Sequence, residues 1–354
     1  ETNREPIMQI IQFLSDQAEP HVGIRDGDQV LNLTAVESTW NSTFQVFQQA
    51  YCEESTIPEL LRSVTPKAPL CPFSYQELWE AKPGTAQPCL LPPLTHEDPY
   101  RVWITGTGLT HTGSMQSRDQ MHGGQQQATE PETDSARMFA MGLAGGRPEA
   151  GQRGTAPEWF YKGNGLMLRG HHEPLDIPAF ARDGGEEPEL VGCYIIDPAG
   201  VPRRLGFALG NEWSDHATET INYLYLAPSK LRSCSVGPEL NLDCNFDNLT
   251  LRCLVQRDSD LLYNSGELKS GEQFMCHSLA NCEDHHFKYP QHRQPGDVHL
   301  HYFGTSKLSH STRDWQYQAG DVIRIEADEV SGPLVNHVAV SASEAASPVT
   351  VKSI

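Results

Sequence analysis

Residues 183–219 read DGGEEPELVGCYIIDPAGVPRRLGFALGNEWSDHATE, and this stretch decides the fold. Residues 190–196 form an apolar run of strand length. The sequence DPAG that follows at 197–200 is typical of a turn, because Pro and Gly supply the backbone angles that a turn needs. The chain then returns through a second run at 201–209. This pattern predicts a β-hairpin that ends on Asn211 and Glu212.

The ends of this hairpin are expected to bring three carboxylates together. Residues two apart in a strand share a face, so Glu187 and Glu189 point the same way, and the returning strand carries Glu212 back toward them. Three close carboxylates repel one another unless a cation lies between them. Oxygen ligands suit Mg²⁺, with Ca²⁺ or Mn²⁺ as substitutes. The alternative is an acidic strand end that faces solvent.

The composition is that of a soluble, turn-rich globular chain with an acidic surface. The 354 residues carry a formal net charge of -20, which argues against nucleic acid or an anionic membrane as partner. No apolar run approaches the length of a membrane span, and the first residues lack the pattern of a signal peptide. The nine cysteines follow no repeating frame, and several lie inside apolar runs. This usage predicts free thiols in a reducing cytoplasm.

The chain divides into two predicted regions. Residues 1–97 are expected to form a small N-terminal α/β module, with short strands near 7–14, 21–24 and 29–33 and helices near 42–49 and 57–64. Residues 98–354 form the main, β-rich region. A helix is expected at 133–143 with Asp134 as its N-cap. The surrounding polar segment, 115–157, is either a lid over the site or a surface insertion.

A second group of metal-ligand residue types lies at 275–286. It contains Cys276, His277, Cys282, His285 and His286. Structural zinc sites usually draw their ligands from two separated pairs, and this segment offers one cluster. We therefore expect a segment at the rim of the active site or at a dimer contact, in which His285 or His286 contacts substrate.

The carboxylate motif resembles the metal-binding core of the fumarylacetoacetate hydrolase superfamily. E-x-E-L followed by N-E-W-S matches the family spacing, although the third ligand of the family is usually Asp rather than Glu. The resemblance implies that Glu187, Glu189 and Glu212 bind Mg²⁺. It also implies a mainly β fold with some α (α+β), built like the rolled mixed sheet of the family's C-terminal domain, and a homodimer.

The sequence GTGLTHTGS at 106–114 resembles the first active-site loop of that family. The family has its catalytic His and Glu where this chain has Ser114 and Ser117, so the hydrolytic His–Glu pair is missing. The resemblance places Thr110, Ser114 and Arg118 at the substrate. It also makes His111, on the glycine-rich loop, the expected proton-transfer residue.

Further motifs extend the resemblance over residues 100–340. They are PEWFYKG around Lys162, SKLRSCSVGPEL beginning near Lys230, and HLHYFGT ending on Gly304 and Thr305. By resemblance, Lys162, Gly304 and Thr305 contact the substrate. Lys230 is expected to be a catalytic residue at the metal site that supports the substrate carboxylate or the developing enolate. His216 and Glu219 are alternative catalytic residues, because the family has functional polar residues at these positions.

These expectations lead to one reaction and two alternatives. A metal-bound 2-keto acid loses its C3 proton more easily, which is the chemistry that the superfamily shares. Because the hydrolytic pair is missing, we expect a Mg²⁺-dependent dehydratase of a 2-keto-3-deoxy sugar acid, with a pentonate as the first candidate. The alternatives are hydrolysis of a C–C bond in an acylpyruvate or fumarylacetoacetate-like diketone, and a sugar-acid-binding protein without catalysis.

Overall fold

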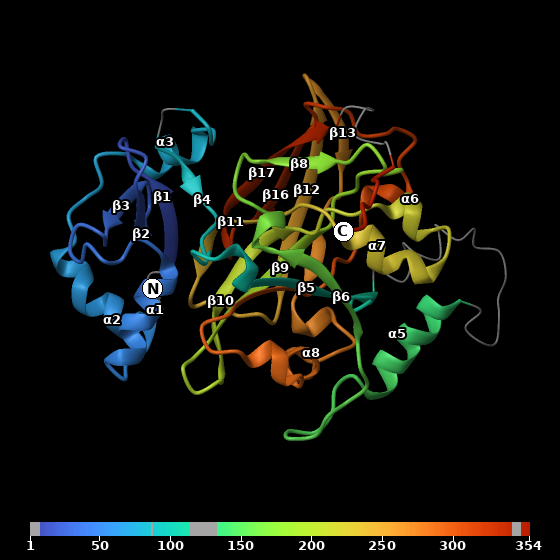
Figure 1. Ribbon diagram of the computed structural model, residues 1–354, viewed down its shortest axis with the longest axis horizontal. Helices are drawn as coiled ribbons and strands as arrows, with labels where there is room; N and C mark the ends of the chain where they lie inside the picture. The colour runs from blue at the N-terminus through green and yellow to red at the C-terminus, as the bar shows by residue number, and fades with distance from the viewer. Residues whose placement is uncertain (1–7, 86–87, 113–132, 342–347) are drawn as a thin grey trace.

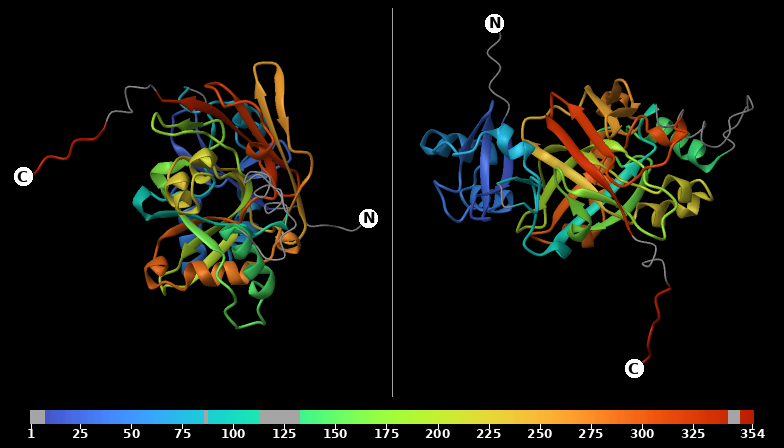
Figure 2. Two further views of the ribbon diagram at one scale, coloured as in Figure 1. Left: turned by 90° about the vertical axis from the view of Figure 1, so that its right-hand side faces the viewer. Right: turned by 90° about the horizontal axis from the view of Figure 1, so that it is seen from above.

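The computed structural model describes residues 8–85, 88–112, 133–341 and 348–354. The N-terminal region, drawn in blue, stands at one end of the molecule, beside a larger β-rich body (Figures 1 and 2). This region contains β1 (Gln9–Leu14), β2 (Pro20–Asp26), β3 (Gln29–Asn32), α1 (Thr43–Cys52), α2 (Ile57–Val64), α3 (Tyr75–Glu80) and β4 (Leu90–Leu91).

One mixed sheet runs through both regions. In the described residues its strands follow the order β3-β2-β1-β11-β10-β9-β15-β5-β6, with β4 beside β1 and β7 beside β11. The pair of β15 and β5 is parallel, whereas β15 and β9 are antiparallel. The strands of the larger body in this sheet are β5 (Val102–Gly108), β6 (Glu158–Asn164), β7 (Leu168–Arg169), β9 (Pro188–Ile196), β10 (Pro202–Asn211), β11 (Cys234–Asn241) and β15 (Val298–Tyr302).

A second sheet packs against the first. Its order in the described residues is β13-β12-β16-β17-β8, with β14 beside β12. These strands are β8 (Pro174–Ile177), β12 (Leu249–Arg257), β13 (Asp260–Asn264), β14 (Leu268–Ser270), β16 (Val322–Ala327) and β17 (Ser331–Val340). The helices of the larger body are α5 (Asp134–Gly145), α6 (His216–Glu219), α7 (Leu226–Lys230) and α8 (Leu279–Phe287).

Strand β9 is buried on both faces because a different layer covers each one. Leu190, Tyr194 and Ile196 belong to the hydrophobic cluster that includes the second sheet. Val191 and Ile195 point the other way and belong to a cluster that includes the N-terminal region. Every residue of β9 is therefore buried, which explains its continuous apolar sequence.

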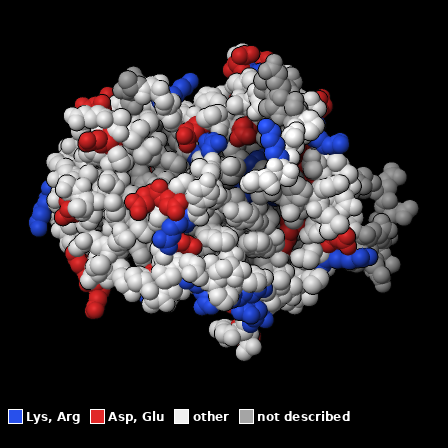
Figure 3. Space-filling model, viewed as in Figure 1, with Lys and Arg blue, Asp and Glu red and all other residues white. Residues whose placement is uncertain are grey.

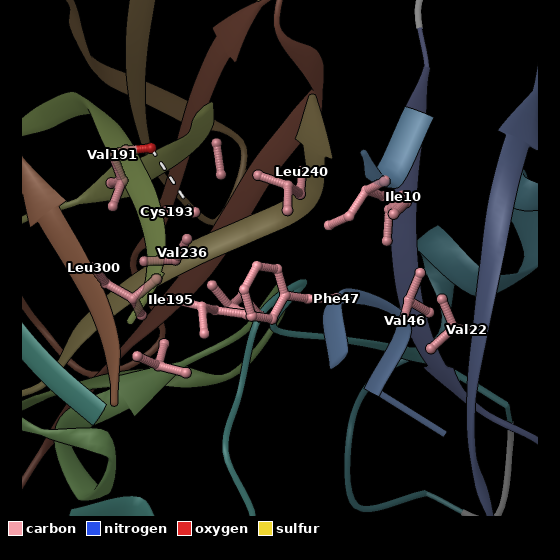
Figure 4. Packing of buried hydrophobic residues seen from close by; sticks show 14 of the residues in the cluster. Ile10, Val22, Val46, Phe47, Val191, Cys193, Ile195, Val236, Leu240 and Leu300 are labelled. Atoms are coloured by element: carbon pink, nitrogen blue, oxygen red, sulfur yellow. Dashed lines mark hydrogen bonds between the residues drawn. The ribbon is translucent and has the colours of Figure 1, made fainter. Parts of the chain in front are cut away.

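The N-terminal region shares this cluster and also has a small cluster of its own, which includes Ile11, Phe13 and Leu78. Ile10 of β1 pairs with Leu240 of β11, so the main sheet continues into the N-terminal region. Figure 4 shows Ile10 and Phe47 reaching toward Leu240 and Ile195 of the larger body. The division at residues 97 and 98 stays a prediction, because the two regions share one sheet and one cluster.

The predicted fold class is confirmed: the chain is mainly β with few helices. The predicted hairpin is present as β9 and β10, joined at residues 197–201. The expected helix is α5, but its cap was assigned wrongly. Thr133, not Asp134, has extended backbone angles, and its side chain accepts a hydrogen bond from Ala136 N. Asp134 already lies in the first turn of the helix.

Candidate functional site

The β9–β10 hairpin places three buried carboxylates beside one another. Gly210 of β10 lies opposite Glu189 of β9. One residue beyond β10, Glu212 N donates to Glu187 O over 3.0 Å, and Asn211 Oδ1 accepts from Glu187 N. One carboxylate oxygen from each of Glu187, Glu189 and Glu212 lies within 4.8 Å of the others. The sequence spacing therefore places all three side chains at one point.

Two lysines enter this carboxylate cluster from other elements. Lys230 Nζ, at the end of α7, lies 2.5 Å from Glu187 Oε1 and 2.5 Å from Glu212 Oε2. Lys162 Nζ, from β6, lies 2.5 Å from Glu212 Oε1 and also donates to the carbonyl of Trp213. Both lysine side chains are almost completely buried. Glu212 is thus held from both sides.

Glu189 is the carboxylate that the lysines do not reach directly. Within the described residues, Gly304 N donates the hydrogen bond that its Oε2 accepts, over 2.7 Å. Burial and the nearby charges of Glu187 and Glu212 hold the pKa of Glu189 well above its usual range. Three carboxylates meet two ammonium groups here, so the cluster needs one more positive charge or one proton.

A divalent cation fits this donor set. The three side chains offer carboxylate oxygens, which are the ligands that Mg²⁺ and Mn²⁺ prefer. A cation at this position would remove the repulsion that raises the pKa of Glu189. The longer side chain of Glu212, compared with the Asp of the family motif, does not keep its carboxylate out of the cluster.

Strand β15 brings the Gly–Thr motif to the cluster. Gly304 has a φ of +90°, and a Cβ there would lie 2.4 Å from Thr110 Oγ1, so glycine permits the close approach. Thr110 Oγ1 donates to Phe303 O over 2.6 Å. The side chain of Thr305 is largely buried, and its hydroxyl donates to Lys307 O. Thr110, Gly304 and Thr305 therefore lie close together, and their contact with substrate stays a prediction.

His111 lies beside Gly304 in a closely packed position. Its Nδ1 is 3.0 Å from Thr110 Oγ1 and its Nε2 is 3.2 Å from Ser270 Oγ. Burial lowers the pKa of His111 to about 4, so its imidazole is neutral at pH 7. Because the Thr110 hydroxyl donates to Phe303 O, Nδ1 carries the ring proton, and Nε2, beside Ser270, is the nitrogen that can accept another.

His216 and Glu219 lie on the short helix α6, on the other side of the cluster. His216 Nε2 is 2.9 Å from Glu187 Oε1, and burial together with the neighbouring His310 lowers the pKa of His216 to about 3. Glu219 is buried at the C-terminal end of the same helix. Asp215 caps α6 by accepting from Thr218 N, which fixes the position of His216.

Not every predicted site residue has the expected surroundings. Lys162 was expected to contact substrate, but its side chain has no exposed area and its ammonium is occupied by Glu212 and two backbone carbonyls. We infer that it orients Glu212. Ser114 and Arg118 lie outside the described residues, as does Ser117.

Glu158 is a buried carboxylate beside the glycine-rich strand β5, and the sequence analysis missed it. It begins β6 opposite Gly108, and a Cβ on Gly108 would lie 1.9 Å from Glu158 Oε1. Its Oε2 accepts a hydrogen bond from Tyr223 OH over 2.8 Å. An acidic residue in the strand that pairs with the glycine-rich strand β5 was the available signal.

The Cys and His side chains of the segment at 275–286 contact other parts of the protein and do not converge on one metal position. His285 Nε2 is 2.9 Å from Gly154 O, and His286 Nε2 is 2.9 Å from His299 Nδ1. Cys276 Sγ lies near Leu109 O, and Cys282 is fully buried. Among the described residues, the groups able to hold a metal are Glu187/Glu189/Glu212 and Asp183/His216/His310, and neither includes this segment.

The surface and the thiols agree with the composition. On the face in Figure 3, acidic and basic side chains are interspersed, so the basic residues do not form one continuous field. All nine cysteines, each within the described ranges, are free thiols. None of the helices that the structure describes is both long enough and apolar enough to cross a membrane.

Neither a protein-family model nor a curated protein matches the chain. The chain does match solved structures. A 2-keto-3-deoxy-D-arabinonate dehydratase complexed with magnesium and 2,5-dioxopentanoate is 16% identical with a TM-score of 0.65, and the match covers 94% of this chain and 99% of that chain. A maleylpyruvate hydrolase from Sphingobium sp. SYK-6, in complex with manganese(II) ion and pyruvate, is 17% identical with a TM-score of 0.55 over 95% and 100%.

The chain shares the fold of these solved structures, as the resemblance to the fumarylacetoacetate hydrolase superfamily predicted. A third match, the 5-carboxymethyl-2-hydroxymuconate delta-isomerase from Mycobacterium smegmatis, has a TM-score of 0.53 at 14% identity and covers 94% of this chain and 100% of that one. The three neighbours differ in reaction, so the fold leaves the chemistry to the residues of the site.

Proposed function

We propose that the chain is a Mg²⁺-dependent enzyme of this superfamily that dehydrates a 2-keto-3-deoxy sugar acid, with a pentonate as the first candidate. The observation that carries the proposal is the buried carboxylate cluster, whose charge two lysines do not balance. The fold match with a dehydratase of a 2-keto-3-deoxy acid supports the choice of reaction. A homodimer and a cytoplasmic location remain predictions.

In this proposal Glu187, Glu189 and Glu212 hold the cation. When bound, the cation polarises the keto group and stabilises the negative charge that forms when the C3 proton leaves. Gly304 and Thr305 lie beside Glu189 and bind the carboxylate end of the substrate. Lys230 acts at the cluster by holding Glu187 and Glu212 in place.

Two proton transfers are needed: one removes the C3 proton, and the other protonates the departing C4 hydroxyl. His111 is the first candidate for proton transfer, because it is neutral and lies beside Gly304. His216, which contacts Glu187, and Glu219, on the same short helix, are the alternative candidates. An His111→Asn variant should keep metal affinity and lose turnover.

The test is turnover of 2-keto-3-deoxypentonates and acylpyruvates with Mg²⁺, with EDTA, and with Glu189→Gln. We expect EDTA-sensitive conversion of a keto-deoxy acid to a semialdehyde. Calorimetry should show that Glu189→Gln weakens Mg²⁺ binding by about 100-fold or more, because losing a ligand should cost more than losing a residue that orients one. The exposed Glu149→Gln serves as the matched control.

Other outcomes would change the assignment. Cleavage of an acylpyruvate would identify a C–C hydrolase, as the similarity to a maleylpyruvate hydrolase allows. Mg²⁺-dependent binding of a keto acid without turnover would identify a binding protein. Full Mg²⁺ affinity in Glu189→Gln would remove the carboxylate cluster as the metal site.

A further inference from the structure

The loop between β15 and β16 carries a histidine to the edge of the carboxylate cluster. His310 Nδ1 lies 3.0 Å from Asp183 Oδ2, and its side chain keeps about 19% of its exposed area. Its ring lies 5.1 Å from the ring of His216, which in turn contacts Glu187. His310 is therefore separated from a proposed metal ligand by a single side chain.

This loop is fixed by Glu186, the neighbour of Glu187. Glu186 Oε1 accepts from Ser309 N over 2.6 Å, and its Oε2 accepts from Ser309 Oγ and Tyr317 OH. Adjacent residues of an extended chain point in opposite directions, so Glu186 can anchor the loop while Glu187 faces the cluster. The position of His310 is thus set by the same segment that supplies the proposed metal ligands.

Asp183 determines which nitrogen of His310 is available. The carboxylate accepts the Nδ1 proton, which leaves Nε2 as the nitrogen for exchange. In the part of the chain that the structure describes, Nε2 of His310 has no hydrogen-bond partner. This is the arrangement of an imidazole that a carboxylate orients for proton transfer.

Asp183, His216 and His310 offer ligand atoms within 4.8 Å of one another, so their spacing would also suit a second cation. Arg313 argues against a cation here. Its Nη2 lies 2.5 Å from Asp183 Oδ2 and also donates to Gly184 O. A guanidinium group therefore already pairs with the one carboxylate of the set, which leaves a metal ion without a free anionic ligand there.

We propose that His310, oriented by Asp183, is a further catalytic residue that gives a proton to the departing C4 hydroxyl of the substrate. The proposal rests on the dehydratase function proposed above. The C3–H bond breaks first, and its proton goes to the base of the site. The electron pair left at C3 then forms the C3–C4 double bond as the C4–O bond breaks. His310, which starts this step with a proton on each ring nitrogen, gives the Nε2 proton to the leaving oxygen to make water, and the neutral ring that remains still donates its Nδ1 proton to Asp183.

The experiment separates the two halves of this reaction. In D2O with Mg²⁺ and a 2-keto-3-deoxypentonate, NMR follows deuterium incorporation at C3 and formation of the semialdehyde. We expect His310→Gln to lower kcat for dehydration by about 10²- to 10⁴-fold, because general acid catalysis has this magnitude. Exchange at C3 should continue at the wild-type rate.

Asp183 is tested as a positioning residue. Asp183→Asn should also lower kcat for dehydration and leave the C3 exchange unchanged, and Asp183→Glu should recover part of the loss, because it restores the acceptor for Nδ1. Asp314→Asn is the matched control: Asp314 lies on the same loop, is exposed, and should behave as wild type. Thermal unfolding of each variant checks that it folds.

Two results would overturn the assignment of His310. One is dehydration by His310→Gln at the wild-type rate. The other is an equal loss of dehydration and of C3 exchange, which indicates a structural role of the loop. These results differ from failure of the proposed function itself, in which the wild-type protein neither exchanges the C3 proton nor forms a semialdehyde.

Discussion

Lys230 lies where a cation is needed whether or not a metal is bound. Burial alone would lower the pKa of Lys230, but the carboxylates of Glu187 and Glu212 raise it, so the ammonium stays charged. Its Nζ also lies 4.8 Å from the centre of the Phe160 ring, and so faces that ring as well as the two carboxylates. Lys230 therefore offsets the repulsion between the carboxylates when no metal ion is bound.

Replacing Lys230 with Met should show this directly. The variant leaves a buried charge without its partner, which should cost about 3 to 5 kcal/mol of the free energy of unfolding. Saturating Mg²⁺ should restore more stability to the variant than to the wild-type protein, because the ion supplies the missing positive charge. Urea unfolding with and without Mg²⁺ measures both effects.

The control for this variant is Lys269→Met, which removes a half-exposed ammonium that pairs with Glu267. Exposed ion pairs contribute about 0 to 1 kcal/mol, so this variant should unfold almost as the wild-type protein does. An equal loss of stability in Lys230→Met with and without Mg²⁺ would show that the ion does not share the site with the lysine.

Strand β15 and helix α8 meet in a layer of buried histidines. His299 and His301 are two residues apart in β15 and point to the same face. Their rings lie 4.9 and 4.7 Å from the ring of His286 on α8. Burial, with a smaller contribution from His292, lowers the pKa of His299 and of His301 to about 3. These histidines are neutral in the folded protein.

This layer should make the protein unstable in mild acid. Histidines in the unfolded chain titrate near pH 6.5, so below that pH the unfolded state binds protons that the folded state does not. Stability should be complete above pH 6.5 and fall as the pH decreases toward 3. At pH 5 each of the two histidines should lower the free energy of unfolding by about 2 kcal/mol.

His301→Gln removes one of these groups and should flatten the fall in stability between pH 7.5 and pH 5.0. Urea unfolding at the two pH values gives the comparison, with His96→Gln, at a partly exposed position, as the control. If His301→Gln loses as much stability as the wild-type protein over this interval, then the ring of His301 is protonated in the folded state.

The molecule as a whole is joined across its two regions. The β1–β11 pairing is accompanied by an ion pair between Arg25 and Glu239 and by a hydrogen bond from Trp79 Nε1 to Pro333 O. These contacts link the N-terminal region to both sheets. We therefore expect the protein to unfold as one cooperative unit.

Ile10→Ala tests this expectation, because Ile10 is fully buried in the shared cluster. The cavity should cost about 2 to 5 kcal/mol. Hydrogen exchange followed by mass spectrometry should show residues 9–26 and 188–211 losing protection together. Faster exchange confined to residues 9–26 would show that the N-terminal region unfolds by itself.

The parts of the fold that depend on neighbours in sequence could be predicted. The hairpin needs an apolar run, a turn and a returning run, and its closure brings Glu212 back to Glu187 with no information from elsewhere in the chain. The Gly–Thr motif of β15 could be placed by resemblance.

Contacts between distant segments could not be read in the same way. His310 and Asp183 are 127 residues apart in the sequence. The loop that carries His310 is fixed by Glu186, and no motif near Glu186 indicates this contact. Lys162 was interpreted as a substrate contact because the sequence does not show its burial, which depends on how β6 packs against α7. The N-cap of α5 differed for a simpler reason, since Thr and Asp adjoin and both are good caps.

The pairing of β1 with β11 has one more consequence. Strand β11 is covered along its C-terminal half by β1, so without the N-terminal region its backbone N–H and C=O groups there would form an open sheet edge, next to Leu240 and Val236. Open apolar edges recruit strands from other copies and lead to aggregation. The N-terminal region thus acts as a cover that keeps the larger body from aggregating through this edge, and a fragment that begins at residue 98 should precipitate rather than remain dispersed.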